Sequence, residues 1–111
     1  MANNIKLIVF PVTDLDKAKT FYNTFLGTEP YVDGGYYVGY KVGDIEVGLD
    51  PNSTVGPISY IDTDDIEASL KSLQESGAEV VMNPKDVAAG LLVAQVRDAD
   101  GNVVGLRQQP K

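Results

Sequence analysis

The sequence predicts an α+β fold in which two tandem βαβββ modules form a curved sheet arrangement that encloses a cavity. Strand and helix patterns follow one another in the same order in both halves of the chain. Two pairs of motifs stand the same distance apart, and a third pair follows in order: Gly27-Thr28-Glu29 with Gly77-Ala78-Glu79, Thr13-Asp14 with Thr63-Asp64, and Val47-Gly48-Leu49 with Val104-Gly105-Leu106. Ordered recurrence indicates an internal repeat. We therefore expect one domain over residues 1–111, with modules at about 1–52 and 56–111.

The first half opens with a strand and a helix. Residues 5–12 form an apolar, β-branched run, which predicts a mostly buried strand. Thr13 or Asp14 can cap the helix that follows, and Gly27 is expected to end it. Apolar residues recur at helical spacing on one face of this helix: Leu15, Ala18, Phe21, Tyr22 and Phe25.

Strand-like segments complete the first half. A short segment near residues 29–32 leads to a turn at Asp33-Gly34-Gly35. Strands are predicted at residues 36–42 and 45–49, joined by a tight turn at Gly43-Asp44.

The second half repeats this order. A strand is predicted at residues 58–61, and Thr63 or Asp64 is expected to cap a helix that Gly77 ends. Strands at residues 79–82, 91–96 and 103–107 follow. The small-residue segment 83–90 is expected to be a loop, either a mobile lid or a plain connector.

Composition excludes several kinds of site and partner. The chain has no cysteine and no histidine, which removes thiolate chemistry and the commonest transition-metal ligand. A formal net charge of −7 argues against nucleic acid as a partner. The apolar run at residues 5–12 is too short for a signal peptide or a membrane span, so we expect a cytoplasmic protein without a membrane partner.

Two motif blocks carry a resemblance to a known family. The first runs from Phe10-Pro11-Val12-Thr13-Asp14 through Phe21-Tyr22 to Leu26-Gly27, and the second joins Asp98-Ala99-Asp100-Gly101-Asn102 to Val104-Gly105-Leu106. Together they make the chain resemble the vicinal-oxygen-chelate superfamily, which contains glyoxalases, bleomycin-resistance proteins and dioxygenases. The resemblance covers nearly the whole chain and implies the fold predicted above.

The family's metal ligands are missing. Metal-dependent members place four ligands on inward strand positions, and the resemblance carries these onto Leu7, Gly48, Pro57 and Gly105. None of these side chains can coordinate a metal. We therefore expect no metal and no cofactor, and we expect neither glyoxalase I nor extradiol dioxygenase activity, because both rely on the cation as a Lewis acid or oxygen activator.

Acidic clusters have plainer explanations than cation binding. The segment 98–102 lacks the glycine position and the closing glutamate of a calcium loop, so a hairpin turn is predicted. The acidic run at residues 62–65 is predicted to be a helix N-terminus.

The predicted function is metal-independent binding of a small molecule by a homodimer, whose pairing the family resemblance implies. The candidate binding residues line the presumed cavity: Leu7, Val9, Tyr37, Glu46, Gly48, Pro57, Ser59, Gly105 and Arg107. Glu46 is also a candidate general base, and a Glu46–Arg107 pair could orient a polar ligand. The alternatives are a metal-free isomerase or lyase that uses Glu46, and a dimeric scaffold without a ligand.

Overall fold

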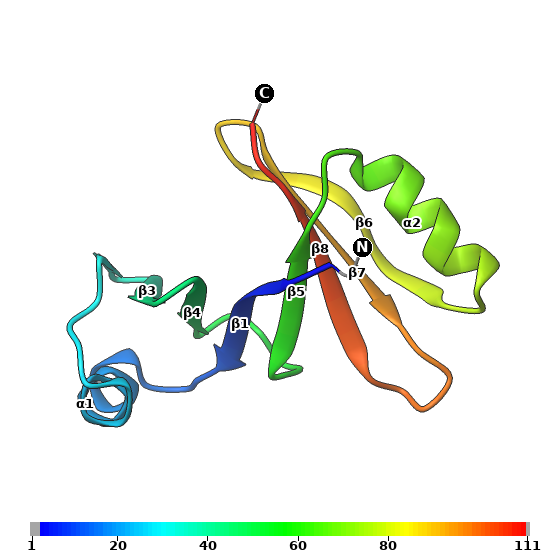
Figure 1. The fold of residues 1–111 in the computed structure, drawn as a ribbon. Coiled ribbons are helices and arrows are strands. Elements are labelled where there is room, and N and C mark those ends of the chain that lie inside the picture. Colours follow the sequence, from blue (N-terminus) through cyan, green and yellow to red (C-terminus); the bar gives the residue numbers. More distant parts are fainter. Residues whose placement is uncertain (1–2, 111) are drawn as a thin grey trace. The chain divides into compact units, whose positions relative to one another are not determined.

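A computed structural model describes residues 3–110 and divides the chain into two compact units (Figure 1). One unit comprises residues 6–58, and the other comprises residues 59–110 together with residues 3–5. The element order is a strand, a helix and three strands, which then recurs. The predicted α+β fold with two tandem βαβββ modules is therefore confirmed.

Module 1 contains β1 (Ile5–Pro11), α1 (Leu15–Leu26), β2 (Val32–Gly34), β3 (Tyr37–Val42) and β4 (Ile45–Asp50). Its strands lie in the order β2-β3-β4-β1. The first strand pairs in parallel with the last, and the other pairs are antiparallel.

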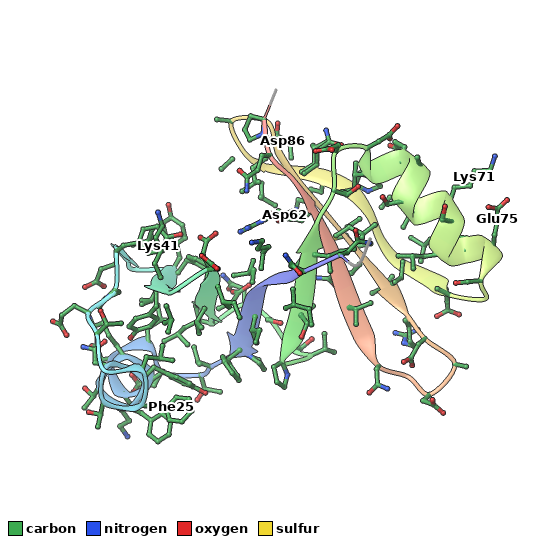
Figure 2. The ribbon with its side chains drawn as sticks, in the orientation of Figure 1. Phe25, Lys41, Asp62, Lys71, Glu75 and Asp86 are labelled. Atoms are coloured by element: carbon green, nitrogen blue, oxygen red, sulfur yellow. The ribbon has the colours of Figure 1, made fainter. Side chains whose placement is uncertain are left out.

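Module 2 contains β5 (Ile58–Asp62), α2 (Ile66–Glu75), β6 (Glu79–Ala88), β7 (Leu91–Arg97) and β8 (Val103–Gln108). Its strands follow the same plan, β5-β8-β7-β6, with β5 parallel to β8. Lys71 and Glu75 lie on the side of α2 that points away from the strands (Figure 2). No described helix is long and apolar enough to cross a membrane.

Each module has its own core on the face that its helix covers. In module 1 the buried residues are Val38, Tyr40, Val47 and Leu49, and α1 packs against them. In module 2 they are Ile66, Leu70, Ala94, Val96 and Leu106. Since successive strand side chains point to opposite faces, the residues between these lie on the other face, which we call the helix-free face.

The helix caps correct the predicted repeat by one residue. Asp14 caps α1, and its side chain accepts a hydrogen bond from the Lys17 amide (3.1 Å). The second cap is Asp65, not Thr63 or Asp64, because its side chain accepts from the Ala68 amide (3.1 Å). In this part of the chain, equivalent residues of the two modules are therefore one residue further apart in the sequence than the motifs indicated. Gly27 ends α1 in the left-handed conformation (φ 71°), as predicted.

Replacing the second cap tests this assignment. Asp65→Ala is expected to lower the free energy of unfolding by about 1 kcal/mol, because the Ala68 amide loses its partner. Urea denaturation followed by circular dichroism measures the change. Asp64→Ala is the matched control and is expected to have almost no effect; a larger loss for Asp64→Ala would contradict the assignment.

The predicted loop at residues 83–90 is wrong for most of its length. Residues 83–88 belong to β6, and Lys85, Asp86 and Ala88 are paired with β7. Three register shifts accommodate Pro84 and small residues within the strand. Only Ala89 and Gly90, both at positive φ, make the turn, so no lid exists here. Two strands of module 1 also differ from their predicted bounds. The segment predicted near residues 29–32 is β2, which begins at Val32, and the strand predicted from residue 36 is β3, which begins at Tyr37.

Candidate functional site

The helix-free face of module 1 brings five of the predicted site residues together. Strand register places Leu7 beside Glu46, and Val9 beside Gly48. Gly48 is also the partner of Gly39, and Tyr37 lies two residues before Gly39 on the same face. Leu7 and Val9 are buried, and each retains 8% exposure.

Tyr37 covers the glycines of this face. A Cβ atom built on Gly48 would stand 2.8 Å from Cζ of Tyr37, and closer still to its hydroxyl oxygen. A Cβ built on Gly39 would stand 3.4 Å from Cε2 of the same ring. The ring therefore lies across two glycines on neighbouring strands. The space above Gly48, at a family metal position, is filled by a phenol group.

Glu46 is half-buried and has polar neighbours that the sequence analysis did not identify. It accepts a hydrogen bond from the Tyr31 hydroxyl. Lys41 is its register partner on β3, and the Lys41 ammonium lies 4.7 Å from the centroid of the Tyr31 ring, a cation–π contact. Strand alternation from Gly39 could have placed Lys41 on this face. Tyr31 lies in the short segment predicted near residues 29–32 and immediately precedes β2, but nothing in the sequence pairs it with Glu46.

Module 2 also has a tyrosine ring over a glycine, but the tyrosine lies on β5, at the position that corresponds to Val9 in module 1. Tyr60 and Gly105 are register partners, and a Cβ built on Gly105 would stand 2.8 Å from Cγ of Tyr60 and closer still to two other ring atoms. The Tyr60 hydroxyl accepts a hydrogen bond from Nε2 of Gln95 (2.9 Å). Tyr60 retains only 6% exposure, so this ring is held tightly between its neighbours.

Ser59 does not share this face with Gly105, and Pro57 lies outside β5. Ser59 is the partner of Val104 and lies on the side of Ile61, which packs against the core under α2. Pro57 is exposed and precedes β5. The cause is the one-residue correction of the repeat, which makes Ile58 the equivalent of Leu7. The predicted placement of Ser59 on the face of Gly105 is therefore wrong, and the placement of Pro57 stays a prediction.

Arg107 is buried on the helix-free face and forms an ion pair with Asp62, its register partner. The Arg107 Nε donates to Oδ1 of Asp62 (2.7 Å) and Nη2 donates to Oδ2 (3.2 Å). Arg107 retains 6% exposure. The ion pair was not predicted, because the sequence analysis interprets Asp62 as part of the acidic start of a helix. Glu46 and Arg107 belong to different modules, and the predicted Glu46–Arg107 pair stays a prediction.

The residues at the family's metal positions do not fit a metal ion. Leu7 and Ile58 are hydrocarbon, and the two glycines lie beneath tyrosine rings. Within residues 3–110, no group of three or more His, Cys, Asp or Glu side chains could hold a metal.

The acidic turn between β7 and β8 is a hairpin turn, as predicted. Asp98 Oδ1 accepts hydrogen bonds from the amides of Asp100 (2.9 Å) and Asn102 (2.8 Å), while Gly101 takes φ 89°. The hydrogen bond from the Asn102 amide is the largest of the effects that hold the pKa of Asp98 below its usual value. The carboxylate thus orders a turn and is not arranged for calcium.

This lowered pKa predicts a pH dependence. The stability that Asp98 contributes is fully present above its unfolded pKa of about 3.9, and it is lost as pH falls through the lower folded pKa. Urea midpoints measured from pH 5 down to about pH 2 test this. The Asp98→Ala variant should lose less stability over that interval than the wild type; identical slopes would contradict the role of Asp98.

Two surface hollows lie elsewhere, one within each module. A hollow of about 360 Å³ in module 1 is bordered by the start of α1 and by Asp33, Gly34 and Gly35. A hollow of about 830 Å³ in module 2 surrounds the start of α2 and includes Asp62 and Gln108. Neither is lined by any of the predicted binding residues.

Comparisons with known proteins agree with this fold. The sequence matches the Glyoxalase/Bleomycin resistance protein/Dioxygenase superfamily over residues 4–106. No curated protein matches it significantly. A hypothetical protein from Bacillus halodurans C-125 shares 18% identity and a TM-score of 0.81, with 100% of this chain and 97% of that chain covered. Methylmalonyl-CoA epimerase from Streptomyces coelicolor, in complex with 2-nitronate-propionyl-CoA, shares 18% identity and a TM-score of 0.78, with 98% and 96% covered.

At these identities, the similarity to solved structures shows the fold alone. The family match, however, spans nearly the whole sequence, and the βαβββ plan of both modules agrees with it. The chain therefore belongs to the Glyoxalase/Bleomycin resistance protein/Dioxygenase superfamily.

Proposed function

We propose that this protein binds a small organic molecule on the helix-free faces of its modules, without a metal ion, as a cytoplasmic homodimer. The observation that carries the proposal is the pair of tyrosine rings over Gly48 and Gly105. These rings occupy family metal positions with groups that stack on and hydrogen-bond to organic molecules. The homodimer and the cytoplasmic location are carried over from the sequence as predictions.

The composition of the module 1 face supports this proposal. Leu7 and Val9 supply buried apolar surface, while Tyr31 and Glu46 supply a hydrogen-bonded polar group beside it. Apolar surface with a few placed polar groups is typical of small-molecule sites.

A ligand-library thermal-shift screen, run with and without EDTA, tests the proposal. A binder present at a hundredfold excess over its dissociation constant stabilises the native state by about 2.7 kcal/mol. We expect at least one such binder, the same shift in EDTA, and no stoichiometric transition metal by elemental analysis. A stoichiometric metal, or a shift abolished by EDTA, would overturn metal independence. Absence of any binder from a dimeric protein would favour the scaffold alternative.

A second candidate is a metal-free isomerase or lyase that uses Glu46 as general base. The favouring observation is the Tyr31 hydroxyl, which donates to Glu46 and fixes the carboxylate on the helix-free face. Turnover that survives EDTA and is lost in Glu46→Gln would support this candidate. Unchanged turnover in Glu46→Gln would exclude Glu46 as the base.

A further inference from the structure

We propose that the bond between Asp100 and Gly101, in the turn that joins β7 to β8, is a modification site at which this protein converts spontaneously to isoaspartate. The inference is independent of the proposed function, because none of the proposed binding residues lies in this turn.

The reaction closes a five-membered ring and opens it again. The backbone nitrogen of Gly101 attacks the side-chain carbon Cγ of Asp100 in its protonated form. A C–N bond forms and one water molecule leaves, which gives a cyclic succinimide. One water molecule then adds to either ring carbonyl: opening at one restores aspartate, and opening at the other leaves the main chain running through the former side chain. The water taken up equals the water released, so no other reactant is needed.

The chain contains two Asp-Gly dipeptides, Asp33-Gly34 and Asp100-Gly101. A glycine after the aspartate favours ring closure, because no side chain hinders the attacking nitrogen and the backbone can adopt the conformation that the ring requires. The sequence therefore does not distinguish the two dipeptides, and the difference between them comes from the structure.

The Asp100 side chain is unrestrained. Every residue of the turn 98–102 is exposed, and this turn forms the end of the β7–β8 hairpin (Figure 1). Among the described residues, the Asp100 carboxylate has no hydrogen-bond or ion-pair partner, whereas the carboxylate of Asp98 accepts hydrogen bonds from two backbone amides. The Cγ atom of Asp100 is therefore free to turn toward the next backbone nitrogen.

One hydrogen bond restrains the attacking atom. The Gly101 amide donates to the carbonyl of Asp98 (3.1 Å), and this bond has to open before the ring can close. The net contribution of a single exposed hydrogen bond is small, so it slows the reaction by about tenfold at most. Local opening of exposed turns is among the least costly motions of a folded chain.

The other dipeptide is held at both of its residues. Nζ of Lys19 lies 3.1 Å from each carboxylate oxygen of Asp33. Asp33 and Gly34 also belong to β2 and are paired with Val38 and Tyr37 of β3. Ring closure there has to break the ion pair in addition to the strand pairing. An exposed ion pair of this kind can slow the reaction about fivefold.

Conversion at Asp100 lengthens the main chain of the turn by one carbon atom. The amide of Asp98 donates to the carbonyl of Asn102 (2.9 Å), and its side chain accepts from the amide of Asp100 (2.9 Å). Both contacts depend on the spacing of these residues along the chain, so we expect isoaspartate to disrupt them. The turn joins two strands whose register partners Ala94 and Leu106 are part of the module 2 core, so the modification would weaken pairing beside that core.

The experiment stores the folded wild-type protein for several weeks at pH 7 and body temperature and then maps isoaspartate in its tryptic peptides. Trypsin cleaves after lysine and arginine, so Asp100 lies in the peptide 98–107 and Asp33 in the peptide 20–41. Electron-transfer fragmentation distinguishes isoaspartate from aspartate, although their masses are equal. We expect the fraction of isoaspartate at Asp100 to exceed that at Asp33 about fivefold.

Matched controls separate the effect of the fold from that of the dipeptide. In guanidinium chloride the two sites should convert to similar extents, because the fold no longer restrains either. Lys19→Ala should raise the fraction at Asp33 about fivefold and leave that at Asp100 unchanged. Asp100→Glu should lose the isoaspartate of the peptide 98–107, because the longer side chain closes a five-membered ring no more.

Equal fractions at Asp33 and Asp100 in the folded protein would overturn the inference. It would also be overturned if the folded protein formed no isoaspartate at Asp100 over a time in which the unfolded chain forms it.

Discussion

Asp62→Ala is expected to lower the free energy of unfolding by about 3 kcal/mol, the lower end of the cost of breaking a buried ion pair. The substitution removes two charge-assisted hydrogen bonds from the Arg107 guanidinium, which is 6% exposed. The lower end applies because the Asp62 side chain is itself 36% exposed and is partly solvated. Urea denaturation at pH 7 measures the loss.

The chain offers a matched control in the same module. Glu79 pairs with Arg97, but both side chains are exposed, at 70% and 44%. Glu79→Ala is expected to cost less than about 1 kcal/mol, since exposed ion pairs contribute little. Equal losses in Asp62→Ala and Glu79→Ala would show that burial of Arg107 does not matter, and would contradict the explanation.

Gly105→Ala is expected to destabilise the protein by about 2 kcal/mol, because an added methyl group overpacks a filled region. The new Cβ would stand 2.8 Å from Cγ of Tyr60, and that ring is held by burial and by Gln95. The ring-edge carbons Cδ2 and Cε2 stand closest to the new Cβ, and because the base of the ring, Cγ, is also too close, a small rotation of the side chain does not relieve the contact. Thermal and urea denaturation both report the loss.

Gly48→Ala is the comparison for this second prediction. The atoms nearest to its new Cβ are the hydroxyl and Cζ of Tyr37, the far end of a half-buried side chain that can move aside. We expect a loss below about 1 kcal/mol, within the range of tolerated core changes. A larger loss for Gly48→Ala than for Gly105→Ala would contradict the difference between the two rings.

Local patterns predicted most of the architecture. Alternation and helical spacing placed both helices and the outlines of most strands, and Gly27 marked the end of α1, because these features depend on neighbours within a few residues. The second cap was missed by one residue for the same reason. Thr63, Asp64 and Asp65 all carry capping groups, and only the backbone of the folded chain selects Asp65.

Contacts between distant segments could not be predicted in this way. The pair of Asp62 and Arg107 depends on the register of β5 against β8, which joins residues 45 positions apart. The placement of Tyr37 over Gly39 and Gly48 depends on a side-chain rotamer, which the sequence does not specify. Glu46 was correctly placed on the face of Gly48, but its contact with Tyr31 joins residues 15 positions apart and depends on how the folded chain brings them together.

The irregularity of β6 has a consequence for solubility. This outermost strand of module 2 is ten residues long, and a regular strand of that length would present an unbroken row of hydrogen-bonding groups to other chains. Three register shifts, the missing amide proton of Pro84 and the charges of Lys85 and Asp86 interrupt that row. The same irregularities and polar residues that made this segment resemble a loop in the sequence thus protect the protein against aggregation through strand addition.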